Sequence, residues 1–271
     1  MRAALVSEYR KFFSTRMWWI LLLCMVGYMA FLAGVFGFSL NVAAGDAADA
    51  GFDGEVFSPT QLAQTIYGLS ATLGYVFPVI VGALSVTGEF RHQTITPTFL
   101  AEPRRGVVLL AKYFSSIPLG LLYGILGTLT TVGVGAGILA LSGNATYLGE
   151  PEVLRTVGLS VLAGALWAMV GVGLGVMLPN QVVSIVLLLV FTQFVEPMIR
   201  VMANLVEWGG TVAQYLPGSA GDALIGASFY NAFSGEGSNL LAWWQGALIL
   251  VGYAVVFGIV GRLTTFRKDI T

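Results

Sequence analysis

Long stretches without a charged residue constrain this chain more than any other feature. No Asp, Glu, Lys or Arg occurs over residues 56–88 or over residues 113–149. Roughly a quarter of the residues in a soluble domain are charged, whereas this chain is 10% charged and 56% hydrophobic. The sequence therefore predicts an integral membrane protein. We expect residues 1–271 to form a single membrane domain, because no segment between the apolar stretches is long enough for a soluble one.

Six apolar segments have about the 20 residues that a helix needs to cross a bilayer. The uncharged residues 156–195 are too long for one span, and Pro179-Asn180-Gln181 predicts a turn that divides them into two helices. We therefore expect an all-α membrane protein with six transmembrane helices. Their predicted ranges are 17–40, 66–87, 112–141, 156–178, 182–203 and 241–261.

The distribution of positive charge predicts the side of the membrane that each loop faces. If both termini lie on one side, residues 1–16, 88–112 and 262–271 share that side and carry 11 of the 13 Lys and Arg. Lys and Arg collect in cytoplasmic loops, so both termini are expected in the cytoplasm. The opposite loops carry mostly Asp and Glu without the spacing of a metal-binding loop, and we interpret them as a solvated acidic face.

Residues 1–16 have the pattern of a basic amphipathic helix on the membrane surface. The apolar residues on one predicted face are Leu5, Val6, Tyr9, Phe12 and Phe13, and the residues expected to point away from it are Glu8, Arg10, Lys11 and Ser14. A simple basic flank of the first span is the alternative. A cleaved signal peptide is not expected, because the uncharged residues 17–40 exceed a signal core of roughly 7–15 residues.

Other patterns predict the local form of the helices. Glycines four residues apart favour close helix packing in the third and fourth spans, in the pairs Gly120 and Gly124, Gly133 and Gly137, and Gly171 and Gly175. Pro78, with Gly74 and Gly82 nearby, predicts a kink in the second span. Residues 207–236 are apolar enough to predict a re-entrant or interfacial helical pair before the last span.

The fifth predicted span contains polar residues inside the membrane. Glu196 and Arg200 are one helical turn apart, Gln193 lies on the same side, and Pro197 lies between them. A lone charge at mid-bilayer costs on the order of 3 kcal/mol, so the two charged groups are expected to pair or to face water in a cavity. The residues either line a substrate path or form a snorkelling pair that ends the apolar stretch near the outer surface.

A short polar segment separates the second and third spans. Residues 88–105 read GEFRHQTITPTFLAEPRR and include the only histidine, His92. Thr94 and Thr96 are candidate helix caps, and residues 98–110 are predicted to form a short interfacial helix that enters the next span. The segment is too short for a domain, so we interpret it as a docking element. His92 has no second His or Cys nearby, which favours a surface contact over a ligand or proton relay.

The sequence lacks the motifs that would make this chain an enzyme. None of its three lysines follows a glycine-rich phosphate-binding loop, and neither a Ser-His-Asp set nor an HExxH pattern occurs. Cys24, the only cysteine, lies in the first span and is expected to pack or to face lipid. We therefore expect no catalytic residue, metal or cofactor on this chain.

The segment GEFRHQTITPTFLAEPRR, followed by residues 107–112, resembles the cytoplasmic loop of ABC-2 type permeases, most closely those of actinobacteria. The resemblance covers the whole chain, because that family shares the amphipathic N-terminal helix, six spans, a short turn between the fourth and fifth spans, and re-entrant helices before the sixth. It implies the membrane subunit of an ATP-driven exporter in the bacterial plasma membrane. The exported substrate would be a hydrophobic or amphipathic drug, lipid or peptide.

The resemblance also implies partners and residue roles. A second permease, identical or related, would form a dimer, and two copies of a separate P-loop ATPase would bind Mg-ATP; membrane lipids would be contacted and nucleic acid would not. Residues 88–105 would couple to the ATPase through Glu89, Phe90, Arg91, His92, Thr94, Arg104 and Arg105. Of these, Glu89, Arg91 and His92 would meet the ATPase or brace the segment against the amphipathic helix, and Arg104 and Arg105 would lie at the lipid headgroups. The substrate pathway would include Phe77, Gln193, Glu196 and Arg200.

Two other functions fit the residues without the resemblance. One is a stand-alone secondary transporter or channel that uses Glu196 as an ion or proton site. The other is a membrane protein that does not transport, such as a sensor or an immunity protein that binds a toxin with its outer loops.

Overall fold

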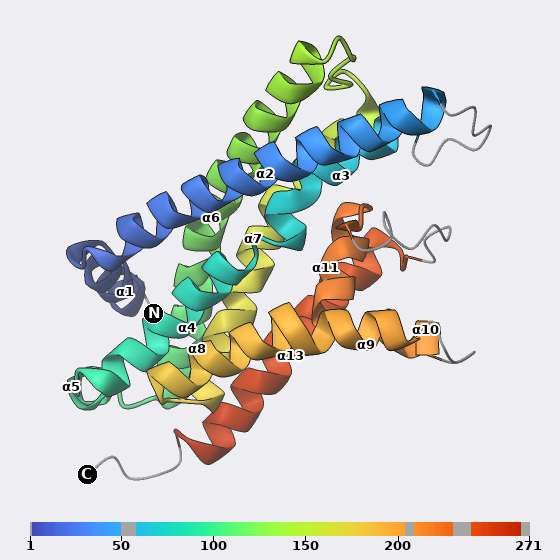
Figure 1. Ribbon diagram of the computed structural model, residues 1–271. Coiled ribbons are helices and arrows are strands. Elements are labelled where there is room, and N and C mark those ends of the chain that lie inside the picture. Colours follow the sequence, from blue (N-terminus) through green and yellow to red (C-terminus); the bar gives the residue numbers. More distant parts are fainter. Residues whose placement is uncertain (1, 50–57, 204–208, 230–239, 267–271) are drawn as a thin grey trace.

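The computed structural model describes residues 2–49, 58–203, 209–229 and 240–266, and these residues form helices without any strand (Figure 1). The helices are α1 (Arg2–Ser14), α2 (Met17–Asp49), α3 (Pro59–Thr72), α4 (Val76–Arg91), α5 (Ile95–Ala101), α6 (Arg105–Leu141), α7 (Pro151–Met177), α8 (Gln181–Val190), the π-helix η1 (Phe191–Val195), α9 (Glu196–Ala203), α10 (Gly209–Ala213), α11 (Pro217–Ile225) and α13 (Trp243–Thr264).

Six helical segments within the described ranges are long and apolar enough to cross a membrane, which confirms the predicted number. They are Met17–Ala43, Pro59–Arg91, Arg105–Leu141, Pro151–Met177, Gln181–Ala203 and Trp243–Thr264. The turn predicted at residues 179–181 is also present, since α7 ends at Met177 and the side chain of Asn180 caps the start of α8. The chain is therefore a multi-pass α-helical membrane protein.

The second span begins earlier than predicted and breaks at a different place. Ser58 and Gln61 form a capping box that starts α3 at Pro59 rather than near residue 66. The helix is interrupted between Thr72 and Val76, so the irregularity precedes Pro78. Pro78 lies in the first turn of α4, where a missing N–H costs no helical hydrogen bond.

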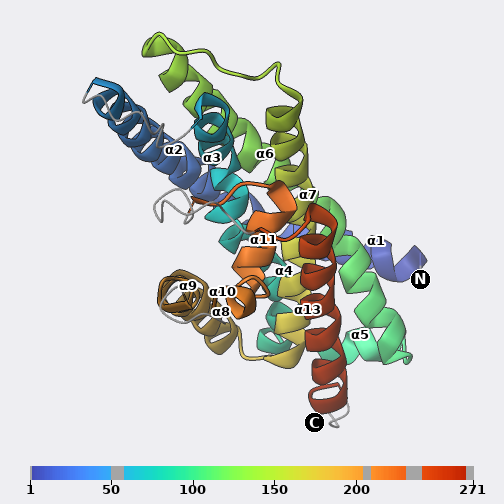
Figure 2. The same ribbon diagram turned by 90° about the vertical axis from the view of Figure 1, so that its right-hand side faces the viewer.

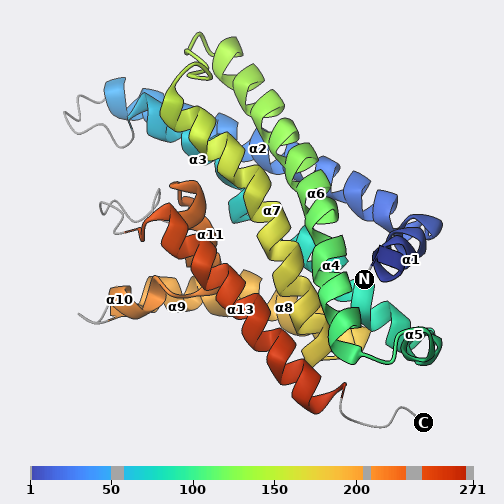
Figure 3. The same cartoon turned by 180° about the vertical axis from the view of Figure 1, so that it is seen from behind.

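Helix α7 is the centre of the bundle and packs along α4, α6 and α13 (Figure 3). Close approach depends on glycine, because a methyl group at Gly120 or Gly124 would collide with the α7 backbone and one at Gly171 or Gly175 would collide with the α4 backbone. Two of the predicted glycine pairs thus make close helix contacts. A methyl group at Gly133 or Gly137 would meet none of the described residues, so this pair makes no such contact with them.

The helix ends lie at two opposite ends of the molecule, as six antiparallel spans require. Helices α1 and α5, the α7–α8 turn and the last turn of α13 lie at one end of the molecule, which we call the α5 end (Figure 1). At the other end α2 and α3 diverge from α9 and α10, as the view turned by 90° shows (Figure 2). The segment α8–η1–α9 lies at the edge of the bundle and exposes apolar side chains, among them Val182, Val186, Phe194, Met198 and Val201.

The predicted helical pair before the last span lies partly outside the described residues, since residues 204–208 and 230–239 are not described. Of the remainder, α11 is a buried helix rather than a surface one. It packs against α3, α7 and α13, and all its residues from Gly218 to Ile225 are buried. It ends at Gly226, whose φ of 72° is the left-handed conformation that glycine adopts without strain.

Candidate functional site

Helix α5 is an exposed helix at the end of the bundle. It follows α4 through a turn in which Gln93 has a left-handed φ of 55°. Ile95 is 2% exposed and anchors the start of the helix, whereas Leu100 is 79% exposed. The remaining exposed positions are Thr96, Pro97 and Ala101. Helix α5 therefore presents a small, partly apolar surface outside the bundle.

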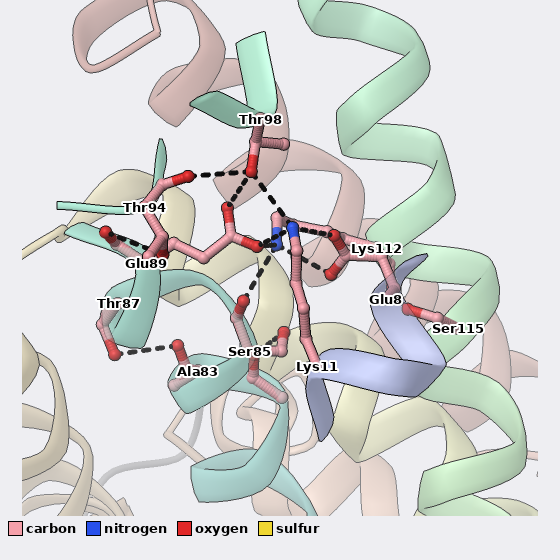
Figure 4. Close-up of polar contacts among 11 residues, drawn as sticks. Glu8, Lys11, Ala83, Ser85, Thr87, Glu89, Thr94, Thr98, Lys112 and Ser115 are labelled. Carbon is pink, nitrogen blue, oxygen red and sulfur yellow. Dashed lines mark hydrogen bonds and ion pairs between the residues drawn. The ribbon is translucent and has the colours of Figure 1, made fainter. Parts of the chain in front are cut away.

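Beneath α5 lies a group of four charged side chains, which we call the charge cluster: Glu8, Lys11, Glu89 and Lys112 (Figure 4). Lys112 Nζ donates to Glu8 Oε2 at 2.9 Å and to Glu89 Oε1 at 2.8 Å. Lys11 Nζ donates to Glu8 Oε1 at 3.0 Å and to Glu89 Oε1 at 2.8 Å. Each ammonium group thus bridges both carboxylates, and the four side chains join α1, α4 and α6.

Three members of the charge cluster are buried, Lys11 is 37% exposed, and the cluster holds as many cations as acids. Lys112 is fully buried, and it donates a third hydrogen bond to the carbonyl oxygen of Ser85 at 2.9 Å. Glu8 and Glu89 are 8% and 6% exposed. Removing ions from water costs several kcal/mol for each ion, and mutual attraction offsets this only when every group is bonded. The two ammonium groups and two carboxylates meet that condition, so losing one of them would leave a buried charge uncompensated.

Thr98 connects α5 to the charge cluster. Its hydroxyl oxygen accepts from Lys11 Nζ at 3.0 Å and lies 3.3 Å from Glu89 Oε2. Burial lowers the pKa of Lys11, but its hydrogen bonds and attraction to Glu89 and Glu8 outweigh burial and raise that pKa above its ordinary value. Lys11 is therefore charged at neutral pH, and α5 is held to α1 and α4 by charge-assisted bonds.

The structure shows what the polar side chains of the first helix contact. Glu8 and Lys11, which were expected to point away from the apolar face of the helix, pair with Lys112 of α6 and Glu89 of α4, and the apolar Val6 and Phe13 are 44% and 49% exposed. The reason is that partners on α4 and α6 satisfy the polar side chains, so the apolar side chains are left for the surface. Phe12 is an exception and packs partly against the cluster around Met25 and Met29.

The short helix predicted over residues 98–110 was wrong. Helix α5 begins at Ile95 and ends at Ala101, and α6 begins separately at Arg105. Pro103 lies in the break, and Glu102 just before it has the extended backbone that a residue preceding proline prefers. Thr94 occupies the N-cap position of α5 but makes no capping hydrogen bond with its side chain.

The other residues predicted for coupling have different surroundings. Arg91 is exposed and donates to Gln181 Oε1 at 3.2 Å, which ties α4 to the start of α8. His92 is exposed, and Phe90 packs near Phe266 with ring centroids 6.3 Å apart.

Arg104 and Arg105 differ from each other. Arg104 is exposed and pairs with Glu102 at 2.9 Å. Arg105 lies over the ring of Phe99 at 5.2 Å and donates to the backbone carbonyl of Phe266, which joins α5, α6 and the end of α13. The phenylalanine side chains of this contact, Phe99 and Phe266, pack edge to face.

A second group of charges, which we call the acidic pair site, lies away from α5 and consists of Glu196, Arg200 and Asp222. Arg200 Nη2 donates to Glu196 Oε1 at 2.8 Å, and Arg200 Nη1 donates to Asp222 Oδ2 at 2.7 Å. The pairing expected for Glu196 and Arg200 is present. A snorkelling pair at the surface is not what the structure contains, because the two acidic side chains are each 2% exposed and Arg200 is 12% exposed.

The remaining predicted pathway residues are not part of the acidic pair site. Phe77 packs near Tyr28 of α2, with ring centroids 5.9 Å apart. Gln193 is half-buried in η1. Cys24 is exposed on α2, which fits the lipid-facing position that its apolar surroundings predicted.

Sequence reasoning missed the residues that complete both groups. Lys112, Ser85 and Thr98 complete the charge cluster, and Asp222 completes the acidic pair site. The one local signal was Lys112 itself, a lone charge at the border of the uncharged residues 113–149. Its partner Glu8 is 104 positions away, so only the fold brings them together.

Comparison of the chain with family models, with curated proteins and with solved structures gives no match. Within the described ranges, no three His, Cys, Asp or Glu side chains are placed to hold a metal ion. The site consists of the exposed helix α5, which is tied through charged side chains to α1, α4 and α6.

Proposed function

We propose that this chain is the permease subunit of an ATP-driven exporter in a bacterial plasma membrane, with both termini in the cytoplasm. Helix α5 would dock on a separate P-loop ATPase, which binds Mg-ATP. Two permeases and two ATPase subunits would form the complex. The support from the chain is its multi-pass helical architecture together with the resemblance of residues 88–105 to the ABC-2 coupling segment.

One observation carries the proposal: α5 is exposed, yet its base is fixed to α1, α4 and α6 by the charge cluster. A docking helix must be accessible to its partner, which Leu100 and its neighbours satisfy. It must also pass a displacement to the membrane helices without bending. Bonds from Thr98 to Lys11 and Glu89, and from these to Lys112, supply such a connection.

The contact between α5 and the end of α13 supports the same role. Arg105 joins the start of α6 to Phe266, and Arg91 joins α4 to α8. A push on α5 would therefore reach α4, α6, α8 and α13. Glu89 braces the segment from below in this scheme, while Leu100 and His92 contact the partner.

Exposed apolar side chains on α2 and on α8–η1–α9 favour a hydrophobic or amphipathic substrate. Phe31 and Phe38 on α2 are 65% and 62% exposed, and Phe194 and Val201 on the fifth span are 73% and 68% exposed. Such surfaces contact lipid, a second permease or a substrate that enters from the membrane.

A second candidate function is a secondary transporter, and one observation favours it. Glu196 is a buried acid inside the fifth span, and its Oε2 atom has no hydrogen-bond partner within the described part of the chain. Intramembrane acids of this kind occur in ion and proton pathways. The two functions differ in whether ATP hydrolysis drives transport.

Recovery of the tagged chain from native membranes in mild detergent tests the proposal. The exporter assignment requires a P-loop ATPase, identified by mass spectrometry at one copy per permease, and vanadate-sensitive ATP hydrolysis. A chain recovered alone and without hydrolysis contradicts it. Proton-driven uptake by the purified chain in vesicles that lack ATP would instead establish the secondary transporter.

A further inference from the structure

The acidic pair site contains more negative than positive charge. Arg200 is the only cation among the described side chains that contact Glu196 or Asp222. Tyr253 of α13, which lies near Glu196, does not change this charge balance, because its hydroxyl donates to the carbonyl of Tyr215 at 3.0 Å. If both acids were ionised, a buried charge of −1 would remain, which is costly inside a membrane protein.

The hydrogen bonds distinguish the two acids. Asp222 Oδ2 accepts from Arg200 and also from the hydroxyl of Ser228 at 2.8 Å, and Thr72 interacts with the same carboxylate. All bonds to Glu196 reach one oxygen, since Oε1 accepts from Arg200 and from the backbone N–H of Ser219 at 3.0 Å. The buried Oε2 atom accepts none from the described residues. An ionised Glu196 would leave a charged, buried oxygen without a donor among the described residues, so the asymmetry favours a proton on Oε2, with Oε1 as the carbonyl oxygen.

The backbone departs from a regular α-helix at Glu196. The π-helix η1 ends directly before it, and the N–H of Glu196 bonds to the carbonyl of Phe191. Pro197 follows, and its ring crowds the carbonyl four residues earlier, which the wider π turn relieves. Single π turns are frequent at functional sites. Helix α9 is thus irregular at the residue that contacts α11.

We propose that Glu196 is a proton-binding site that latches α9 to α11. With the proton on Oε2, the acidic pair site is neutral and its buried contacts are stable. Loss of the proton leaves two carboxylates for one arginine, and the repulsion favours separation of α9 from α11. All three residues of the acidic pair site belong to this chain, so the latch does not depend on the ATPase partner proposed above.

Infrared spectroscopy of the full chain in lipid nanodiscs tests the proton directly. At neutral pH the wild type is expected to show the carbonyl band of a buried carboxylic acid, and Glu196→Gln is expected to lose it. The matched control Glu152→Gln, at an exposed position, keeps the band. Absence of the band in the wild type, or its persistence in Glu196→Gln, overturns the proposal. The Gln side chain has the shape of the protonated acid, so this variant is expected to fold.

Asp222→Asn tests the cause of protonation. Removing that carboxylate leaves Glu196 as the one acid among the described residues that pairs with Arg200, so Glu196 ionises and the band is lost in this variant as well. A band that remains in Asp222→Asn contradicts the shared-arginine explanation.

A distance measurement tests the latch. Spin labels at Met202 on α9 and Leu248 on α13, both exposed and placed in a Cys24→Ser background, report the separation of the two sides of the site. The wild-type distance is expected to increase as pH rises, while the distance in Glu196→Gln stays constant. If the distance between the labels changes with pH in the same way in the wild type and in Glu196→Gln, the latch is overturned.

Discussion

Lys112 Nζ lies 2.9 Å from Glu8 Oε2, although the residues are 104 positions apart, and the lysine is fully buried. This contact closes the charge cluster between the N-terminal helix and the third span. Lys112 also donates to Glu89 Oε1 and to the carbonyl oxygen of Ser85. The helix before the first span, α1, is consequently tied to the bundle through charged side chains.

Replacing Lys112 by methionine is expected to destabilise the fold by about 3–5 kcal/mol, because Glu8 and Glu89 are left with Lys11 as their one cation. The free energy of unfolding in mixed micelles measures the effect. Arg104→Met is the matched control, since Arg104 is exposed, and its change is expected within about 0.5 kcal/mol.

A rescue experiment separates charge from packing at the same site. Lys112→Met combined with Glu8→Gln restores charge balance and is expected to recover part of the lost stability. Equal losses of unfolding free energy in the single and double variants would show that the volume of the lysine side chain, and not its charge, determines the loss of stability.

The pH dependence of the charge cluster follows from Lys11, whose pKa is raised above 10.5 by its bonds to Glu89 and Glu8. A raised pKa of a base contributes stability that is complete below the unfolded value and is lost as pH rises through the folded value. The difference in unfolding free energy between wild type and Lys11→Met should therefore be constant up to pH 10.5 and decline above it. A decline that begins near neutral pH would mean that burial lowers the pKa of Lys11 by more than its ion pairs raise it.

Glycine substitutions test the packing around α7. A methyl group at Gly171 would collide with the backbone of Val79, so Gly171→Ala is expected to cost about 1–3 kcal/mol. Gly133 faces open space within a helix, and Gly133→Ala is expected to stabilise by up to about 1 kcal/mol. Equal effects at both positions in thermal unfolding would contradict the assigned helix contacts.

The elements were predictable from the sequence to the extent that they depend on local pattern. Apolar length determined the six spans, and Pro179 with Asn180 determined the turn between two of them. The partners of Glu8 and Lys11 were not predictable, because an amphipathic pattern cannot tell whether water or a buried partner satisfies the polar face of α1.

The charge cluster and the acidic pair site could be predicted from the sequence only in part. Glu196 and Arg200 were expected to pair because they are one turn apart on one helix. Asp222 joins them from a separate helix, and Lys112 joins Glu8 from another. Such contacts depend on how the helices pack, which periodicity does not encode.

The measurement that tests the central claim most directly is photocrosslinking from α5 in native membranes. A photoreactive residue at Leu100, which is 79% exposed, is expected to capture a P-loop ATPase that mass spectrometry identifies. The same residue at Leu141, which is 91% exposed at the opposite end of α6, is the control and is expected to capture none. Capture of the ATPase from Leu141, or its absence from the products at Leu100, would contradict docking through α5.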